Sequence, residues 1–453
     1  MRKIFDWGVR ASWALPMQGQ VEVKTDYFIG VKGTEITYSG PLRAAHKSQC
    51  KKWIDGKGMV LLPGLINAHT HLPMTLFRGL EDDVPLKVWL FERIFPLENK
   101  FVSPDFVKTG TGLAALECIR FGTTTVSDMY FFVEESAKVW EKAGLRGIFA
   151  QALMSFPIPE DKKLGSDRFA RFDHLRKKFA KSDLIQIALS PHAPYTCDDD
   201  LLKKVAAKSK ETGALVHIHL SESVSEEPDS QKKYGQSQTE RLKALDLLGN
   251  RTVCAHAVHL SPSDRKLLKD SGTGVIHNPD SNLKLGSGIA PIAEYLADGI
   301  PVALGTDGSA SANDLSLFGA MDLATKVQKL SHKDNTAMVA SQALWMATQG
   351  GAQAIGLGDQ IGSLTVGKKA DFILVDFNFP HLQPVHDPMS HLVYSAQGLE
   401  VDTVFCNGKM LLKNKKHVTL KAPAIYAKAE SYRKKIKNFL KKLALESKLS
   451  SQK

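Results

Sequence analysis

The chain has 453 residues, of which 43% are hydrophobic and 24% are charged, a composition that fits a folded globular enzyme and argues against bulk disorder. This length suffices for one large barrel with a companion module. The net charge of +11 raises the question of nucleic-acid binding, but much of the excess lies in the lysine-rich stretch 428–453. A solvent-exposed helix explains such a charge run, and no interleaving of aromatic and basic residues predicts a groove for single strands. We therefore expect no nucleic-acid partner.

Targeting signals and cysteine patterns are absent from the sequence. No stretch approaches the ~18 consecutive apolar residues of a membrane span, and Asp6, Trp7 and Arg10 interrupt the N-terminal apolar residues, which argues against a signal peptide. The five cysteines include no pair at CxxC spacing, which disfavours a disulfide framework or a cysteine-type zinc site. We expect a cytoplasmic protein with no membrane partner.

Three regions follow one another along the chain. Residues 1–60 contain short extended segments separated by turn residues and predict a small β-module. Between residues 61 and 357, eight apolar runs alternate with helical stretches, which predicts an α/β fold, a (β/α)8 TIM-type barrel. The apolar runs are 61–66, 123–128, 146–153, 184–190, 214–220, 252–258, 273–278 and 301–307, and helical candidates include 104–121, 134–143, 198–212, 238–248, 261–270 and 314–331. An open doubly wound sheet would usually carry a GxGxxG turn, which is absent here.

Strand-like sequence returns after the barrel. Residues 358–420 include the runs GSLTVGKKADFILVDFN and EVDTVFCNGKMLL, and Asn407-Gly408 between apolar residues indicates a hairpin. We expect the two β-rich ends, 1–60 and 358–420, to form one β-sandwich module with the barrel inserted between them. Residues 421–453 are expected to form a basic C-terminal helix.

Two histidines follow the first predicted barrel strand. His69 and His71 lie in the segment NAHTH, and residues i and i+2 of an extended segment point to the same side. Two imidazoles that converge on one ion suit zinc or ferrous iron. In such a barrel the chemistry lies at the carboxyl ends of the strands, so this pair is in a suitable place.

The fifth predicted strand ends in HIHLSE, where His217 and His219 share one face. We expect one of the two to be a metal ligand and the other to pack against or support the ligands. Glu222 follows just past the strand end, where a glutamate can move protons beside a metal without binding it.

Polar residues also end the sixth and eighth predicted strands, with His256 in CAHAVH and Asp307 in LGTDGS. A carboxylate at an otherwise apolar strand end is costly unless it meets a cation or a donor. Four strand ends of this kind predict a metal site. The fourth strand ends in LSPHAPY, with His192 but without a lysine that could bridge two ions, which favours one metal.

Several segments together resemble the amidohydrolase superfamily: PGLINAHTH, HIHLSE, AHAVH, SNLKLGSGIAP, LGTDGSAS and GSLTVGKKADFILVD. Within it the chain is similar to the methylthioadenosine/S-adenosylhomocysteine deaminase group. The stretch HTHLPMTLFRGLEDD, followed by Trp89 and Glu98, carries this narrower resemblance. The similarity extends from about residue 20 to about residue 415.

The resemblance implies a role for each of these residues. It assigns one divalent metal, with Zn²⁺ ahead of Fe²⁺ and Mn²⁺, to His69, His71, His219 and Asp307. Glu222 matches a proton shuttle that also contacts the substrate, His256 matches a histidine beside the hydroxide, and Asp307 would accept the proton of the water. Glu98 matches an acceptor for the ribose hydroxyls, His192 and Trp89 match substrate contacts, and Ser311 matches a residue near the metal aspartate.

The implied reaction is hydrolytic deamination of an adenine nucleoside: 5′-methylthioadenosine, 5′-deoxyadenosine, adenosine or S-adenosylhomocysteine. Hydroxide attacks C6 of the purine, Glu222 delivers a proton to N1, and ammonia leaves. Two alternatives stay open: a related amidohydrolase that acts on a free purine, pyrimidine or triazine ring, and an inactive barrel that serves as a binding module. Relatives often associate, so a homo-oligomer also stays open.

One position departs from the family pattern. Relatives that accept S-adenosylhomocysteine place arginines after the third strand to hold the amino-acid carboxylate, but here Gln151 occupies the place where an arginine is expected. The following loop offers Lys162, Lys163 and Arg168, none in a matching pattern. A neutral amide cannot replace a bidentate guanidinium–carboxylate pair. We therefore expect a substrate with a small 5′ substituent.

Overall fold

The structure is a computed structural model that describes residues 3–80, 82–84 and 88–450. Its central sheet has eight strands, each parallel to the next and arranged in chain order. The strands are β5 (Leu65–Thr70), β6 (Thr123–Tyr130), β7 (Arg146–Leu153), β8 (Ile185–Pro191), β9 (Val216–Leu220), β10 (Thr252–His256), β11 (Gly274–His277) and β12 (Val302–Leu304). A parallel bridge between Thr70 and Asp307 joins the two ends of this sheet. The predicted (β/α)8 barrel is confirmed.

Helices surround the barrel, and several begin with caps that the sequence encodes. Ser103 accepts a hydrogen bond from the Phe106 amide, with Pro104 at the first helical position, and Ser237 and Ser261 form capping boxes. The helices are α4 (Pro104–Arg120), α5 (Val133–Ala143), α6 (Asp161–Leu164), α7 (Arg168–Phe179), α8 (Asp199–Thr212), α9 (Glu226–Tyr234), α10 (Gln238–Ala244), α11 (Pro262–Ser271), α12 (Pro279–Lys284), α13 (Ile292–Ala297), α14 (Leu317–His332), α15 (Ala340–Met346) and α16 (Gln349–Ala354).

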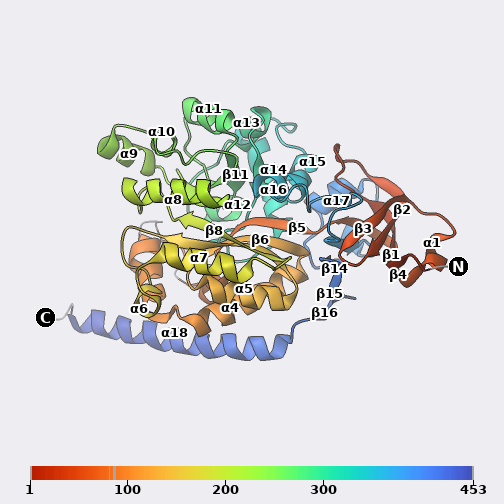
Figure 1. The fold of residues 1–453 in the computed structure, drawn as a ribbon, viewed down its shortest axis with the longest axis horizontal. Helices are drawn as coiled ribbons and strands as arrows, with labels where there is room; N and C mark the ends of the chain where they lie inside the picture. The colour runs from red at the N-terminus through yellow and green to blue at the C-terminus, as the bar shows by residue number, and fades with distance from the viewer. Residues whose placement is uncertain (1–2, 81, 85–87, 451–453) are drawn as a thin grey trace.

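A second sheet contains strands from both ends of the chain. Its order is β16-β15-β14-β13-β4-β1-β2-β3, and Figure 1 shows it as a separate unit beside the barrel. The strands are β1 (Phe5–Ala14), β2 (Lys24–Lys32), β3 (Glu35–Pro41), β4 (Cys50–Pro63), β13 (Phe372–Asp376), β14 (Val401–Cys406), β15 (Lys409–Lys413) and β16 (Lys416–His417), accompanied by α1 (His46–Gln49), η3 (Pro380–Leu382) and α17 (Pro388–Tyr394). The predicted β-module from both ends is confirmed.

The apolar run 61–66 was predicted to be one strand, and that prediction is wrong. Its first residues end β4 of the mixed sheet, and its last residues begin β5 of the barrel. Gly64 separates the two strands, and a Cβ there would lie 2.2 Å from Thr124 Oγ1. Only glycine lets the chain pass this closely from one sheet to the other. Apolar character alone could not show the break, because both strands are buried.

A buried ion pair also ties the two units together. Arg146, the first residue of β7, donates to Asp371 just before β13, with Nε 2.8 Å from Oδ2. The amide of Asn407 donates to the other oxygen of the same carboxylate at 2.6 Å. Asn407 and Gly408 both have positive φ angles and join β14 to β15, so the predicted hairpin is confirmed at this junction.

The chain ends in a long helix, α18 (Ala422–Ser450), which packs along α4 and also contacts the segment after β5 (Figure 1). That segment holds three short elements: η1 (Leu72–Phe77), η2 (Trp89–Ile94) and α3 (Phe95–Phe101). Among the described residues, none of the helices has the length and apolarity to cross a membrane.

Candidate active site

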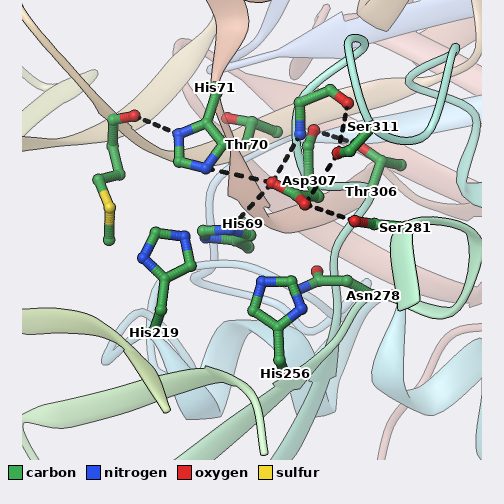
Figure 2. A network of polar contacts seen from close by, with 12 residues as sticks. His69, Thr70, His71, His219, His256, Asn278, Ser281, Thr306, Asp307 and Ser311 are labelled. Atoms are coloured by element: carbon green, nitrogen blue, oxygen red, sulfur yellow. Dashed lines mark hydrogen bonds and ion pairs between the residues drawn. The ribbon is translucent and has the colours of Figure 1, made fainter. Parts of the chain in front are cut away.

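The carboxyl ends of the barrel strands bring the predicted metal ligands together (Figure 2). One potential ligand atom from each of His69, His71 and His219 lies within 4.8 Å of the others, and the same holds for His69, His256 and Asp307. These residues come from four strand ends: β5, β9, β10 and the turn after β12. Residues almost 240 positions apart thus meet because parallel strands end at one rim.

Asp307 lies at the centre of this cluster. Its Oδ1 is 3.3 Å from His69 Nε2 and 3.1 Å from His71 Nε2. Its Oδ2 accepts hydrogen bonds from Ser281 Oγ at 2.6 Å and Ser311 Oγ at 2.9 Å. Asp307 has a φ of +65°, a left-handed conformation that aspartate adopts more readily than most residues. The carboxylate is therefore held in one orientation by both neighbouring hydroxyls.

Each imidazole of the cluster is oriented through its other ring nitrogen. His71 Nδ1 is 2.5 Å from the Met129 carbonyl, and His219 Nδ1 is 2.7 Å from the His192 carbonyl. His69 Nδ1 is 2.8 Å from His217 Nε2. These contacts leave the Nε2 atoms directed into the cluster, the arrangement in which a histidine ligand is held by a supporting partner.

The sequence left open which histidine of HIHLSE belongs with the ligand cluster. His219 lies in the cluster, whereas His217 is buried behind it and contacts His69 and, at 3.0 Å, Ser127 Oγ. Both histidines are on β9, so sequence spacing alone could not separate them. The geometry gives His217 a supporting place and His219 a place among the candidate ligands.

The charges of the cluster fit a cation. Burial lowers the pKa of His69 to about 4 and lowers the pKa of His219 well below the usual histidine value. Burial also opposes protonation of His71, yet the adjacent Asp307 carboxylate raises the pKa of His71 to about 9. In turn, His69 and His71 hold the pKa of Asp307 well below its usual value despite burial. The Asp307 carboxylate therefore stabilises positive charge at the centre of the cluster. A metal ion supplies such charge and displaces protons from its ligands.

Unpaired buried atoms give a second test of the metal site. Nε2 of His256 and Nε2 of His69 are buried and make no hydrogen bond, although His69 Nε2 lies 3.3 Å from Asp307 Oδ1, and such atoms are costly unless another group meets them. Three imidazoles and a carboxylate match the donors that zinc, iron and manganese accept. The residues present therefore fit a divalent metal ion.

Glu222 and His256 lie next to each other at the edge of the cluster. Glu222 Oε2 is 3.8 Å from His256 Nε2, and His256 Nδ1 is 2.7 Å from Asn282 Oδ1. His256 has a φ of +74°, which aims its ring inward from the end of β10. Burial raises the pKa of Glu222 to about 7, so this carboxyl can change its protonation state near neutral pH.

One cavity connects the candidate ligands to the predicted substrate residues. It is lined by Trp89, Glu98, His192, Glu222 and Ser311 in addition to His71, His219, His256 and Asp307. Every residue that the sequence assigned to the substrate or to catalysis therefore faces this space. His69 is buried just behind the lining.

Glu98 is a buried carboxyl that lines the same cavity. It lies on α3, and the Tyr130 hydroxyl donates to its Oε1 at 2.6 Å. Burial raises the pKa of Glu98 to about 7, although the Tyr130 hydroxyl acts in the opposite direction. Its partly satisfied oxygens can accept further hydrogen bonds from a ligand in the cavity.

Sequence reasoning missed two residues that shape this site. Tyr130, the last residue of β6, pairs with Glu98, and Asp128 on the same strand accepts from the Leu72 amide at 2.7 Å and from Thr70 Oγ1 at 3.0 Å. Asp128 thereby fixes the segment that carries His71. A signal for Asp128 existed, since it ends the run TTTVSD, but the predicted strand stopped before Tyr130.

Comparison with known proteins gives a consistent result. Residues 60–411 match the model of the amidohydrolase family. A protein of Syntrophobacter fumaroxidans named 5-methylthioadenosine/S-adenosylhomocysteine deaminase is 42% identical, over 90% of this chain and 93% of its own length. The 5′-deoxyadenosine deaminase of Methanosphaera stadtmanae is 40% identical, over 84% and 88%. The crystal structure of an adenosine deaminase from Xanthomonas campestris with bound zinc superposes with a TM-score of 0.93 at 35% identity, covering 97% of this chain and 100% of that one.

Proposed function

Since the chain belongs to the amidohydrolase family, we propose that it is a metal-dependent deaminase that hydrolyses the 6-amino group of an adenine nucleoside. Water and the nucleoside give the corresponding inosine analogue and ammonia. The observation that carries the proposal is the placement of buried Glu98 in the same cavity as Glu222 and the His/Asp cluster. The three relatives reported above are named as deaminases of adenine nucleosides, which supports the same substrate class.

The metal of this proposal is zinc, held by His69, His71, His219 and Asp307. The zinc bound in the similar adenosine deaminase structure supports this choice, as does the donor set of three imidazoles and one carboxylate. When bound, such an ion supplies Lewis acidity that lowers the pKa of a coordinated water toward neutrality.

The five cysteines are free and buried, which supports a reducing cytoplasmic setting.

The protein groups then divide the proton transfers among themselves. Asp307, whose pKa is held low by His69 and His71, accepts the proton of the attacking water, and His256 orients the nucleophile through its inward Nε2. Glu222 delivers a proton to N1 of the purine, so that the ring accepts electrons as C6 is attacked. The proton taken by Asp307 passes to the amino group, which leaves as ammonia, and the proton of the new C6 hydroxyl returns to Glu222. Glu222 suits this role because its pKa of about 7 leaves it partly protonated at neutral pH.

The remaining lining residues hold the nucleoside. Glu98 accepts from the ribose hydroxyls, since a buried carboxylate forms strong hydrogen bonds with donors. His192 and Trp89, which also line the cavity, contact the substrate. Ser311 lines the cavity but also donates to Asp307, so we assign it mainly to the orientation of that carboxylate.

The surroundings of Gln151 favour a small, uncharged 5′ substituent. Gln151 is buried, and its amide donates to Glu160 at 2.5 Å. Arg171 pairs with Glu160 at 3.0 Å, and Arg168 pairs with Asp161, so both guanidinium groups of this loop are already neutralised. The remaining cations of this loop, Lys162 and Lys163, are exposed lysines of α6, and a lysine cannot supply the bidentate pair of the missing arginine.

Apolar side chains occupy the space beyond Glu98. The adjoining cavity is lined by Phe95, Glu98, Asn99, Phe131, Met154, Phe156, Pro157, Ile158 and Pro159. Burying a carboxylate among such residues without a partner is unfavourable. We therefore rank 5′-methylthioadenosine, 5′-deoxyadenosine and adenosine ahead of S-adenosylhomocysteine as substrates.

A substrate panel tests the proposal. Zinc-loaded protein would be mixed separately with these four nucleosides and with free adenine and guanine, while the release of ammonia is measured. We expect turnover of the nucleosides with small 5′ groups, with S-adenosylhomocysteine weaker by about tenfold or more, as the loss of a charged hydrogen bond implies. Absence of ammonia from every adenine nucleoside would refute the proposed function, and turnover of a free base alone would favour the alternative of a free-ring hydrolase.

Replacing Glu98 by glutamine should weaken binding of the nucleoside. We expect KM to rise roughly tenfold to a hundredfold, the loss expected for a hydrogen bond to a charged group. The pH dependence gives a sharper check. Glu98 must be ionised to accept from ribose, and its pKa is about 7, so kcat/KM of the wild type should fall as the pH drops below that value. In the glutamine variant this acid limb should disappear, and its persistence would show that another group titrates.

A further inference from the structure

The C-terminal helix α18 buries one face against the wall of the substrate cavity. It lies outside the residues that match the family. Tyr432 and Ile436 are buried, and Phe439 and Leu440 pack partly buried in the same cluster. The spacing of these residues is that of one helical face, and lysines are frequent elsewhere in the helix. An amphipathic helix of this kind stabilises what its apolar face covers.

Two aromatic contacts join α18 to the elements beneath it. The Tyr432 ring meets the Phe106 ring edge to face at 5.3 Å, and its hydroxyl donates to Asp105 Oδ2 at 2.9 Å. About two turns further along, the Phe439 ring meets the Phe101 ring edge to face at 5.4 Å. Such aromatic pairs add to the stability that burial alone gives.

The partners of these two contacts, Phe101 and Phe106, connect α18 to residues that line the cavity. Phe101 ends α3, three residues after Glu98, and the Val102 amide donates to the Glu98 carbonyl at 2.9 Å. On the other side, Phe106 packs against Phe77 at 4.9 Å. Phe77 ends η1, the element that carries the cavity residue Met74. The apolar face of α18 and the cavity wall thus belong to one hydrophobic cluster, separate from the main barrel core.

We propose that α18 is a brace that positions Glu98, with Phe439 as the principal positioning residue acting through Phe101. This proposal rests on the proposed role of Glu98 at the ribose. The physical reason is that α3 continues directly from the π-helical segment η2, and a helix of about this combined length is only marginally stable without tertiary packing. The position of its buried carboxyl is therefore set by what packs against the helix, and Phe439 supplies part of that packing.

Phe439→Ala tests the brace, with Phe439→Leu as the conservative variant. Tyr426→Ala is the matched control, because Tyr426 is an aromatic residue of the same helix that is 55% exposed. With the preferred nucleoside, Phe439→Ala should raise KM about tenfold while kcat changes by less than about threefold, since the proton-transfer groups are untouched. Phe439→Leu should recover most of the loss. Zinc content should stay at the wild-type level in all three variants.

Coupling to Glu98 separates positioning from general destabilisation. In the double variant Phe439→Ala/Glu98→Gln, KM should be close to that of Glu98→Gln alone, because the two residues act as one unit. Additive effects, or an equal KM change in Tyr426→Ala, would overturn the proposal.

Hydrogen exchange gives a readout that needs no substrate. Amides of residues 88–104 should exchange faster in Phe439→Ala than in wild type, and those of β9 should not change. Unchanged exchange in 88–104 would refute the brace even if the enzyme deaminates nucleosides. Faster exchange in a protein without deaminase activity would support the brace and refute only the proposed function.

Discussion

Substitution of Asp307 by asparagine is expected to reduce turnover by at least about a thousandfold, since this carboxylate serves both as a ligand and as the proton acceptor. Asparagine keeps the size of the side chain and tolerates the left-handed backbone at this position. The hydroxyls of Ser281 and Ser311, which donate to Asp307 Oδ2, would lose a charged acceptor. Bound zinc should also fall well below one equivalent after dialysis, because the variant lacks the only carboxylate of the donor set.

The loss should be measured as zinc per chain and as kcat, with folding followed by circular dichroism. Asp314→Asn is a matched control, because it makes the same change seven residues further along, at an exposed carboxyl outside the cavity. The control should keep its zinc and its activity. Full zinc occupancy together with wild-type turnover in Asp307→Asn would contradict the assignment of both roles.

The sequence predicted those parts of the site that lie at regular places in the fold. Parallel strands of a barrel all end at one rim, so His71, His219, His256 and Asp307 could be expected to meet once each was placed at a strand end. The same reasoning found Glu222, which lies just past β9. The apolar runs therefore predicted the barrel and also the rim where most of the candidate site residues lie.

Other features depend on packing that a sequence pattern does not express. His217 and His219 lie on the same face of β9 and differ in their position along the strand, where His217 meets Ser127 and His69. The break at Gly64 depends on the nearby Thr124 side chain, which is 60 residues away in the chain. The contact of Phe439 with Phe101 joins residues more than 300 positions apart, so the helix could be predicted but its partner could not.

Glu222→Gln should retain zinc and lose turnover. Glutamine keeps the shape of the side chain but cannot donate a carboxyl proton to N1, and general acid catalysis is worth roughly a hundredfold to ten-thousandfold. Glu222 is not among the clustered ligand groups, so its replacement should leave metal content unchanged. This combination distinguishes it from Asp307→Asn, in which zinc and turnover fall together. Glu211→Gln, which makes the same change at an exposed glutamate of α8 outside the catalytic cavity, is the matched control.

The pH dependence of the wild type gives an independent check on the same residue. Glu222 must be protonated to act as the acid, and burial raises its pKa to about 7, so kcat/KM should fall as the pH rises above that value. Together with the acid limb from Glu98, this predicts a bell-shaped profile. Glu98→Gln should remove the acid limb and keep the alkaline one, because in the proposed function the two carboxyls act on different parts of the nucleoside. Loss of both limbs in that variant would mean that the alkaline limb does not belong to Glu222, and wild-type turnover in Glu222→Gln would exclude this residue as the proton donor.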